Sequence, residues 1–206
     1  MPKKEAPIDH LQNFLPPNTY EAVLSYLHHY KVHLTVAKER KSILGDYRHQ
    51  GYGKNHRISV NGNLNSYSFL ITLLHELAHL LTFEQYGNRV QSHGKEWKAI
   101  FGKLLHQFVQ KKVFPPDISA ALMQSLENPS ASSCADDALL RVLKNHDKKD
   151  EKLKFVEGVP LGTLFKTQDG RIFRKGEKVR KRFKCEEVST KRLYLFSPVY
   201  EVEPVL

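Results

Sequence analysis

The stretch Phe69-Leu70-Ile71-Thr72-Leu73-Leu74-His75-Glu76-Leu77-Ala78-His79-Leu80-Leu81 decides what fold and chemistry to expect of this 206-residue chain. Apart from Thr72, His75, Glu76 and His79, every position is apolar, which is typical of a helix buried on most sides. Residues four apart lie on one face of a helix, so His75 and His79 can offer two imidazole nitrogens to one metal ion. Glu76 lies beside them, displaced around the helix axis, where a carboxylate can take a proton from a water that the metal activates.

The competing interpretation is structural: the two histidines and the glutamate would be core residues whose polar groups are paired with other groups of the protein. Burying two histidines and a glutamate costs several kcal/mol unless these side chains are paired or coordinate a metal. A metal ion offsets that cost for all three side chains at once, whereas a purely structural role needs other partners for each of them. The surroundings therefore favour a metal site.

A hydrolytic zinc site needs a third protein ligand and one open position. The continuation HxxGxxH is excluded, because Thr82 and Gln85 stand where it requires glycine and histidine. Two candidates for the third ligand remain, His93 and, one turn later, Glu96. Of these we favour His93.

The region after the metal helix predicts how His93 reaches the metal. Gly87 is expected just past the helix end, where φ is positive. Ser92 is expected to cap a second helix that begins at His93 and carries Trp97 on its apolar side. A short loop would fold this helix back on the first one and bring His93 toward the metal.

The HExxH run, followed at this distance by His93-Gly94-Lys95-Glu96-Trp97-Lys98, resembles the SprT-like (Spartan-related) zinc metallopeptidase family, over roughly residues 15 to 112. The resemblance implies one zinc ion bound by His75, His79 and His93, with Glu76 as the general base. It also implies cleavage of peptide bonds in DNA-associated or DNA-crosslinked proteins, and hence a role in DNA repair. Many relatives carry a C-terminal ribbon with four zinc-binding cysteines. This chain has two cysteines, Cys134 and Cys185, and no second metal is expected.

The pattern before the metal helix predicts an α+β, zincin-like domain of helices and a small sheet. Two helical pieces are expected within residues 8–30, interrupted by paired prolines. Three strand-like segments follow, at residues 32–36, 42–47 and 57–61. We expect the strand Ile58–Val60 to be the edge along which an extended substrate lies.

A small all-β module is expected at the end of the chain. Residues 144–152 form a charged segment, which places the boundary between a metallopeptidase domain at 1–147 and a basic, degenerate ribbon-like module at 148–206. Within the module, Asp169-Gly170 indicates a tight hairpin between strands at 163–167 and 171–174. Further strands are expected near 178–184, 192–196 and 199–202.

Positive charge is denser in this module than in the rest of the chain. The chain has a net charge of +10, and residues 151–206 hold 13 Lys and Arg against 8 Asp and Glu. Basic side chains neutralise phosphates, so nucleic acid, single-stranded or duplex, is the expected partner besides the protein substrate. The nucleic-acid-binding residues expected are Arg171, Arg174, Lys175, Lys178, Arg180, Lys181, Arg182 and Lys184. Phe173 and Phe183, interleaved with them, are expected to belong to the core of the module.

Composition excludes several other classes of protein. The N-terminus lacks the apolar segment of a secretory signal, and no apolar run is long enough to span a bilayer. A soluble, cytoplasmic protein without membrane contacts, and possible association with a nucleoid or chromatin, is expected. Two rival functions stay open: a DNA-binding protein whose zinc site is structural or vestigial, and a zinc peptidase that does not depend on DNA.

Overall fold

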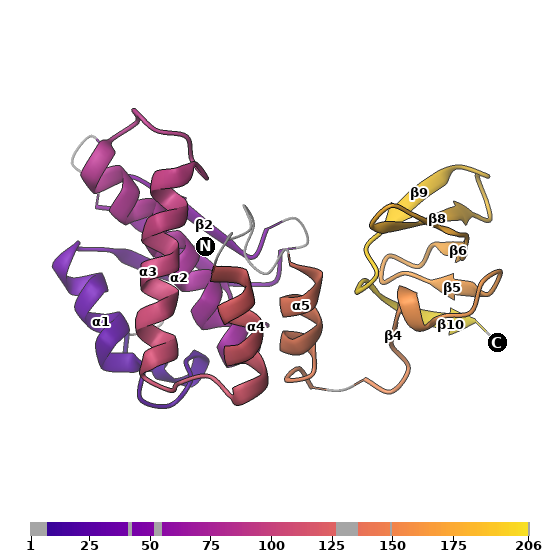
Figure 1. Cartoon of the computed structure of the whole chain (residues 1–206), viewed down its shortest axis with the longest axis horizontal. Helices are drawn as coiled ribbons and strands as arrows, with labels where there is room; N and C mark the ends of the chain where they lie inside the picture. Colours follow the sequence, from indigo (N-terminus) through magenta and orange to yellow (C-terminus); the bar gives the residue numbers. More distant parts are fainter. Residues whose placement is uncertain (1–7, 41–42, 52–54, 127–135, 149, 206) are drawn as a thin grey trace, which may run out of the picture. The chain divides into compact units, whose positions relative to one another are not determined.

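The computed structural model describes residues 8–40, 43–51, 55–126, 136–148 and 150–205. The chain divides into two compact units, residues 1–147 and 148–206, and each is treated by itself (Figure 1). The fold is α+β: the described residues contain five α-helices and two β-sheets. Among the described residues, none of the helices is long and apolar enough to cross a membrane.

The first unit contains a three-stranded sheet. Its strands are β1 (His33–Ala37), β2 (Gly45–Arg48) and β3 (Arg57–Asn61). Their order is β1-β3-β2, with β1 parallel and β2 antiparallel to β3. The three expected strands are confirmed, but the expectation that Ile58–Val60 is an edge was wrong. β3 pairs with β1 on one side and with β2 on the other, so it is the central strand. Ile58 and Val60 are buried in the core of the unit, and β2 is the edge strand beside the helix that carries the HExxH motif.

Helix α2 (Ser66–Tyr86) forms the centre of this unit. Asn65 caps its first turn by accepting a hydrogen bond from the Ser68 amide. The Asn65 amide group also donates to Leu143 O and Asp147 Oδ1, which ties the start of α2 to the end of the unit. At the other end Gly87 has φ of 61°, as expected of a glycine past a helix terminus.

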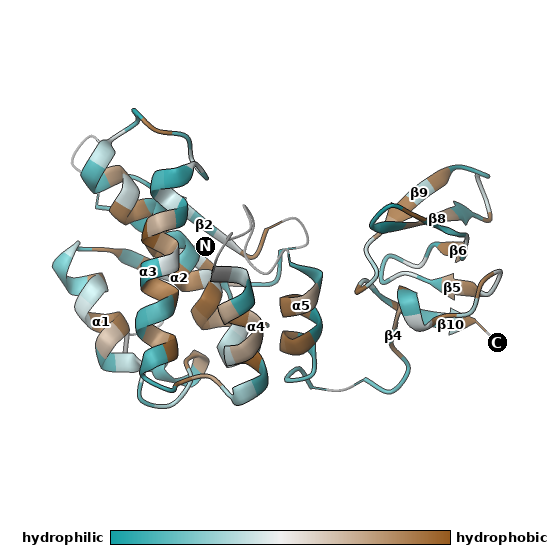
Figure 2. Cartoon of the chain, viewed as in Figure 1, coloured by the Kyte–Doolittle hydropathy of each residue, from teal (hydrophilic) through white to brown (hydrophobic). Residues whose placement is uncertain are grey.

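The remaining helical segments pack their apolar residues into one core with α2. Figure 2 shows α5 brown on one side and teal on the other, which reflects its buried Leu139 and Leu143. The segments are the 3₁₀ helix η1 (Ile8–Phe14) and the α-helices α1 (Tyr20–His29), α3 (Lys95–Gln110), α4 (Pro116–Leu126) and α5 (Asp137–Lys144).

The second unit is a seven-stranded, antiparallel sheet in the described residues. The strands follow the order β4-β10-β5-β6-β8-β7, and β9 pairs with β8. They are β4 (Lys154–Phe155), β5 (Leu164–Lys166), β6 (Ile172–Arg174), β7 (Lys178–Val179), β8 (Arg182–Glu187), β9 (Leu193–Phe196) and β10 (Glu201–Val205), with the short 3₁₀ helix η2 (Val156–Gly158) after β4.

Two details of this unit bear on the sequence analysis. The hairpin between β5 and β6 is confirmed, with Gly170 at φ of 85° in its turn. The segment 178–184, expected as one strand, is instead a hairpin, because Arg180 has φ of 57° and reverses the chain between β7 and β8. Phe165, Phe173 and Cys185 are fully buried in the core of the unit.

Candidate metal centre

Two of the expected ligands stand one turn apart on the buried helix α2. The Nε2 atoms of His75 and His79 lie 3.2 Å apart. His75 is 4% exposed, because the apolar residues on either side of the motif hold α2 inside the core. The helical spacing of the motif therefore brings both imidazoles to one point.

His93 completes the cluster from the loop before α3. Its Nε2 atom lies 3.3 Å from Nε2 of His75, and the ligand atoms of all three histidines lie within 4.8 Å of one another. The expected helix start was wrong: α3 begins at Lys95 with Gly94 as its N-cap, not at His93 with Ser92 as its cap. A turn closed by the Gly94 amide and Gln91 O precedes the helix, and His93 lies in that turn.

The competing ligand Glu96 lies outside this cluster. It is in the first turn of α3, and its Oε1 atom lies 3.9 Å from Lys95 Nζ. Among the described residues, His75, His79 and His93 are the group that could hold a metal ion.

The spacing of the three nitrogens fits a zinc ion. A tetrahedral zinc with Zn–N bonds of about 2.0–2.1 Å holds its ligand nitrogens about 3.3–3.4 Å apart, close to the 3.2 and 3.3 Å observed. Burial, with the neighbouring histidines as a further cause, lowers the pKa of His75 to about 3 and that of His79 to about 4. Both imidazoles are therefore neutral at pH 7, which is the form that binds a metal.

The ring of Trp97 on α3 packs against all three histidines of the cluster. Its ring is fully buried, and its centroid lies 4.6 Å from that of His75, 5.3 Å from that of His79 and 4.7 Å from that of His93. Such packing restricts the rotamers of all three histidines before any metal binds. The sequence predicted an apolar role for Trp97, and its periodic position on α3 gave no sign of this contact.

Glu76, which follows His75 on α2, lies against strand β2. The residue is 6% exposed, and burial, followed by the nearby charge of Asp46, raises its pKa to about 8, against a lowering effect of Arg40. The backbone of β2 lies directly against it: a Cβ atom added to Gly45 would meet Glu76 Oε1 at 2.5 Å and Thr72 Cγ2 at 2.8 Å. Glycine at position 45 is what allows the edge strand to approach the carboxylate.

Arg40 fixes the chain just before β2. Its guanidinium donates to Asn61 Oδ1 at 2.8 Å and to Ser59 Oγ at 2.9 Å, both on β3. Asn61 in turn donates to Arg40 O and Ile43 O. These hydrogen bonds hold Arg40 and Ile43 against β3, close in sequence to Gly45. They therefore help to fix the position of β2 against Glu76.

A chain of side chains links β2 to the far end of α2. Tyr47 on β2 stacks on His79 with a centroid distance of 6.4 Å and an interplanar angle of 4°. Its hydroxyl lies 2.9 Å from His56 Nδ1, and His56 Nε2 lies 3.2 Å from Glu84 Oε1. Burial, with a smaller effect of Glu84, raises the pKa of Tyr47, which keeps the phenol protonated. Sequence reasoning assigned no role to His56, because its spacing from the motif carries no signal.

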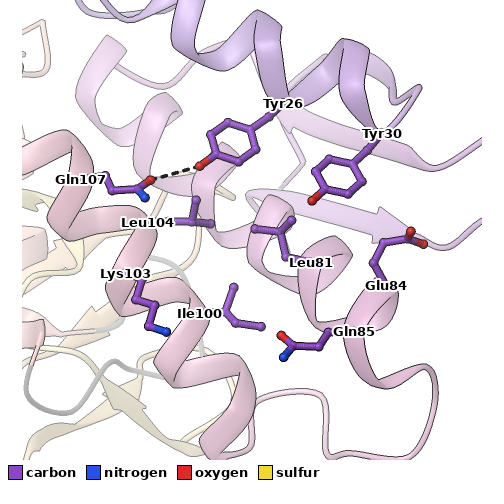
Figure 3. A pocket seen from close by; sticks show the side chains of 9 residues that line it. All are labelled: Tyr26, Tyr30, Leu81, Glu84, Gln85, Ile100, Lys103, Leu104 and Gln107. Carbon is purple, nitrogen blue, oxygen red and sulfur yellow. Dashed lines mark hydrogen bonds between the residues drawn. The ribbon is translucent and has the colours of Figure 1, made fainter.

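A separate pocket lies on the flank of α2 that faces α1 and α3 (Figure 3). It has a volume of about 540 Å³, and the Tyr26 hydroxyl and Gln107 Oε1 bond across it at 3.1 Å. None of the expected metal ligands lines it. The lining residues are Tyr26, Tyr30, Leu81, Glu84, Gln85, Ile100, Lys103, Leu104 and Gln107.

Comparison with known proteins covers the unit that holds the cluster. The model of the SprT-like family matches residues 18–119, a segment that includes His75, Glu76, His79 and His93. The chain belongs to the SprT-like family. Protein SprT of Glaesserella parasuis serovar 5 (strain SH0165) is 35% identical to it over 81 residues, which cover 37% of this chain and 51% of that protein. This SprT-like chain thus spans about half the length of the curated relative it matches, and no solved structure matches it significantly.

The basic residues expected to bind nucleic acid lie in the second unit of this SprT-like chain. Seven of the eight are exposed, namely Arg171, Arg174, Lys178, Arg180, Lys181, Arg182 and Lys184. Arg171 is partly engaged, because its guanidinium lies 2.8 Å from Asp169 Oδ2 and 3.8 Å from Glu187 Oε1.

Lys175 does not fit the expected role. It is 6% exposed, and its ammonium donates to Glu157 O at 3.1 Å and to Val159 O at 2.5 Å, and lies over the ring of Phe183. Burial lowers its pKa. The ammonium forms hydrogen bonds inside the unit and is therefore not available to bind a phosphate. Cys185 is also buried and serves the core, whereas Cys134 lies outside the described residues.

Proposed function

We propose that this SprT-like protein is a zinc metalloendopeptidase whose reaction is centred on His75, His79 and His93. The observation that carries the proposal is the convergence of three imidazole nitrogens with a buried carboxylate beside them. A bound zinc ion would supply Lewis acidity, lowering the pKa of a water to about 7 and polarising a peptide carbonyl. Membership of the SprT-like family supports the same function.

Glu76 is the proton carrier in this proposal. Its carboxylate takes the proton of the attacking water and delivers it to the leaving amine. The pKa of about 8 would fall beside a bound dication, because an opposite charge within a few ångströms favours the ionised carboxylate. Close approach of the β2 backbone at Gly45 restricts the carboxylate of Glu76, which neighbours His75 in the sequence.

The substrate is proposed to lie along β2, in a zincin-like arrangement. Among the described residues β2 pairs with β3 alone, so its other edge can pair with an extended peptide. Gly45 and Tyr47 on this strand contact Glu76 and His79. A peptide bound at this edge would pass the proton carrier and one metal ligand.

Proteins associated with or crosslinked to DNA are the proposed substrate class. Support comes from the seven exposed basic side chains of the second unit, whose charge would attract the phosphates of nucleic acid. A DNA strand bound there would raise the local concentration of its associated proteins near the metallopeptidase unit.

The test is cleavage of a DNA-binding protein by the zinc-loaded chain, with and without single-stranded DNA, beside a chelator-treated sample. Cleavage that needs both zinc and DNA supports the full proposal. Cleavage that needs zinc alone retains the peptidase and removes DNA from its function. No cleavage by a zinc-loaded chain that binds DNA would favour a DNA-binding protein with a structural zinc site.

A further inference from the structure

Strand β9 lies at an edge of the sheet in the second unit. Among the described residues it pairs with β8 alone. Its four residues Leu193-Tyr194-Leu195-Phe196 contain no charge, proline or glycine, although natural edge strands generally carry such features to prevent pairing with other chains. The edge of β9 is therefore open to a further strand.

The hydrogen-bond ladder shows which peptide groups of β9 face outward. The amide of Glu187 bonds to Arg192 O, so odd-numbered residues of β8 bond toward β9, while the amide of Lys184 bonds to Glu177 O on the other side. With Cys185 opposite Tyr194 in the register, the alternation of an antiparallel pair turns the peptide groups of Leu193 and Leu195 away from β8. These two residues offer N–H and C=O groups to an added strand.

The side chains of the same two residues are unusually exposed. Leu193 is 57% and Leu195 is 58% exposed, and Figure 2 shows the apolar stretch of β9 in brown. The intervening residues hold the strand in place from the opposite face, because the rings of Tyr194 and Phe196 lie 5.4 and 4.9 Å from that of Phe173. The unit thus presents two apolar side chains on a strand that is itself firmly packed.

The charges around this edge are mostly positive. Residues directly opposite each other share one face of a sheet, so Lys184 lies on the face of Leu195, and Glu186 on that of Leu193. Glu186 is already paired with Lys191 at 3.4 Å. Arg192, which directly precedes β9, lies by alternation on the opposite face, that of Tyr194. Within the part of the chain that the structure describes, neither the exposed Lys184 nor the exposed Arg192 pairs with a carboxylate.

We propose that β9 is a docking edge for an extended segment of a partner protein that alternates apolar and acidic residues. The segment adds to the sheet as one more strand through the outward peptide groups of Leu193 and Leu195. Its apolar side chains cover the two leucines, and its acidic side chains, which point to the opposite face of the sheet, meet the positive charge of Arg192 on the face of Tyr194. A nucleic acid strand would use the charges but has no need of two exposed leucines, so the observations favour a protein partner at this edge.

The experiment measures binding of a fluorescently labelled ten-residue peptide that alternates valine and glutamate. The full chain carries Glu76→Gln, so that the probe cannot be lost to the proposed peptidase activity. We expect saturable binding, and affinity reduced about tenfold or more when Leu193→Lys and Leu195→Lys are combined. A peptide that alternates valine and lysine should bind at least about tenfold more weakly, because the positive charge of Arg192 repels its lysines.

Val179→Lys is the matched control, because it places the same charge on another exposed apolar residue of this unit, 48% exposed on β7. It should bind the valine–glutamate peptide as the parent chain does. Melting temperatures of all variants show whether the fold is kept. Leu195→Pro is a second variant: it removes one outward N–H and no bond to β8, and it should also weaken binding.

Three results would overturn the proposal. The first is no binding of the valine–glutamate peptide, or equal binding by the folded double-lysine variant. The second is self-association of the chain that the double-lysine variant abolishes while the peptide does not bind, which would assign the edge to a second copy. The third is binding of a single-stranded oligonucleotide that the double-lysine variant loses, while its binding of the peptide is unchanged.

Discussion

Gly45 and Glu76 are in direct contact: a Cβ atom at position 45 would lie 2.5 Å from Glu76 Oε1 and 2.9 Å from Glu76 Cγ. Any side chain at position 45 would displace either the carboxylate or the backbone of β2. The contact therefore joins the proposed proton carrier to the strand proposed to hold the substrate. The glycine is required here for close approach, and no other residue type provides it.

Gly45→Ala tests this contact. The methyl group should move the Glu76 carboxylate or β2, and a displacement of about 1 Å near reacting groups can cost about 100-fold in rate. We expect peptide turnover to fall by about tenfold to 100-fold while zinc content stays near that of the parent chain. Gly51→Ala is the control, since a Cβ atom there meets nothing within 4 Å. Equal turnover of the two variants would show that the contact does not matter for catalysis.

His93→Ala tests the third metal ligand. Loss of one of three protein ligands should greatly weaken zinc binding, and zinc should then no longer raise the melting temperature of the chain. His106→Ala, an exposed histidine on the same helix α3, should bind zinc normally, and so should Glu96→Ala. Zinc bound by His93→Ala but lost in Glu96→Ala would reverse the assignment.

The histidine cluster of the candidate metal site was predictable from sequence because its geometry is encoded locally. His75, Glu76 and His79 depend only on the helical period, and the structure places the two histidine nitrogens within 3.2 Å of each other. His93 comes from a loop whose turn is closed by Gly94 and Gln91, so its approach could be inferred but the start of α3 could not. Backbone hydrogen bonds within a turn leave little signal in residue types.

Contacts between segments far apart in the chain were not predictable. The central place of β3 results from its parallel pairing with β1, and alternation of residue types does not reveal which strand lies in the middle. The links of Arg40 to Ser59 and of His56 to Glu84 are likewise tertiary. The basic run 171–184 predicts a surface cation at Lys175, yet the fold turns this one ammonium inward.

Lys175→Met tests the internal role of that ammonium. Methionine keeps much of the side-chain volume but leaves Glu157 O and Val159 O without their donor, at a cost of about 1–3 kcal/mol for each unsatisfied group. We expect the second unit to unfold at lower temperature or denaturant concentration. Lys178→Met, on the exposed strand β7, should leave stability unchanged and weaken DNA binding instead. Unaltered stability of Lys175→Met would contradict the structural role.

The most direct test of the central claim is peptide turnover by zinc-loaded Glu76→Gln, compared with the parent chain at equal, measured zinc content. Glutamine keeps the size of the side chain and the three histidines but cannot carry the proton. We expect zinc binding to be retained and turnover to fall by about 100-fold to 10,000-fold, the range associated with loss of a general base. Turnover at the parental rate with zinc bound would contradict the account.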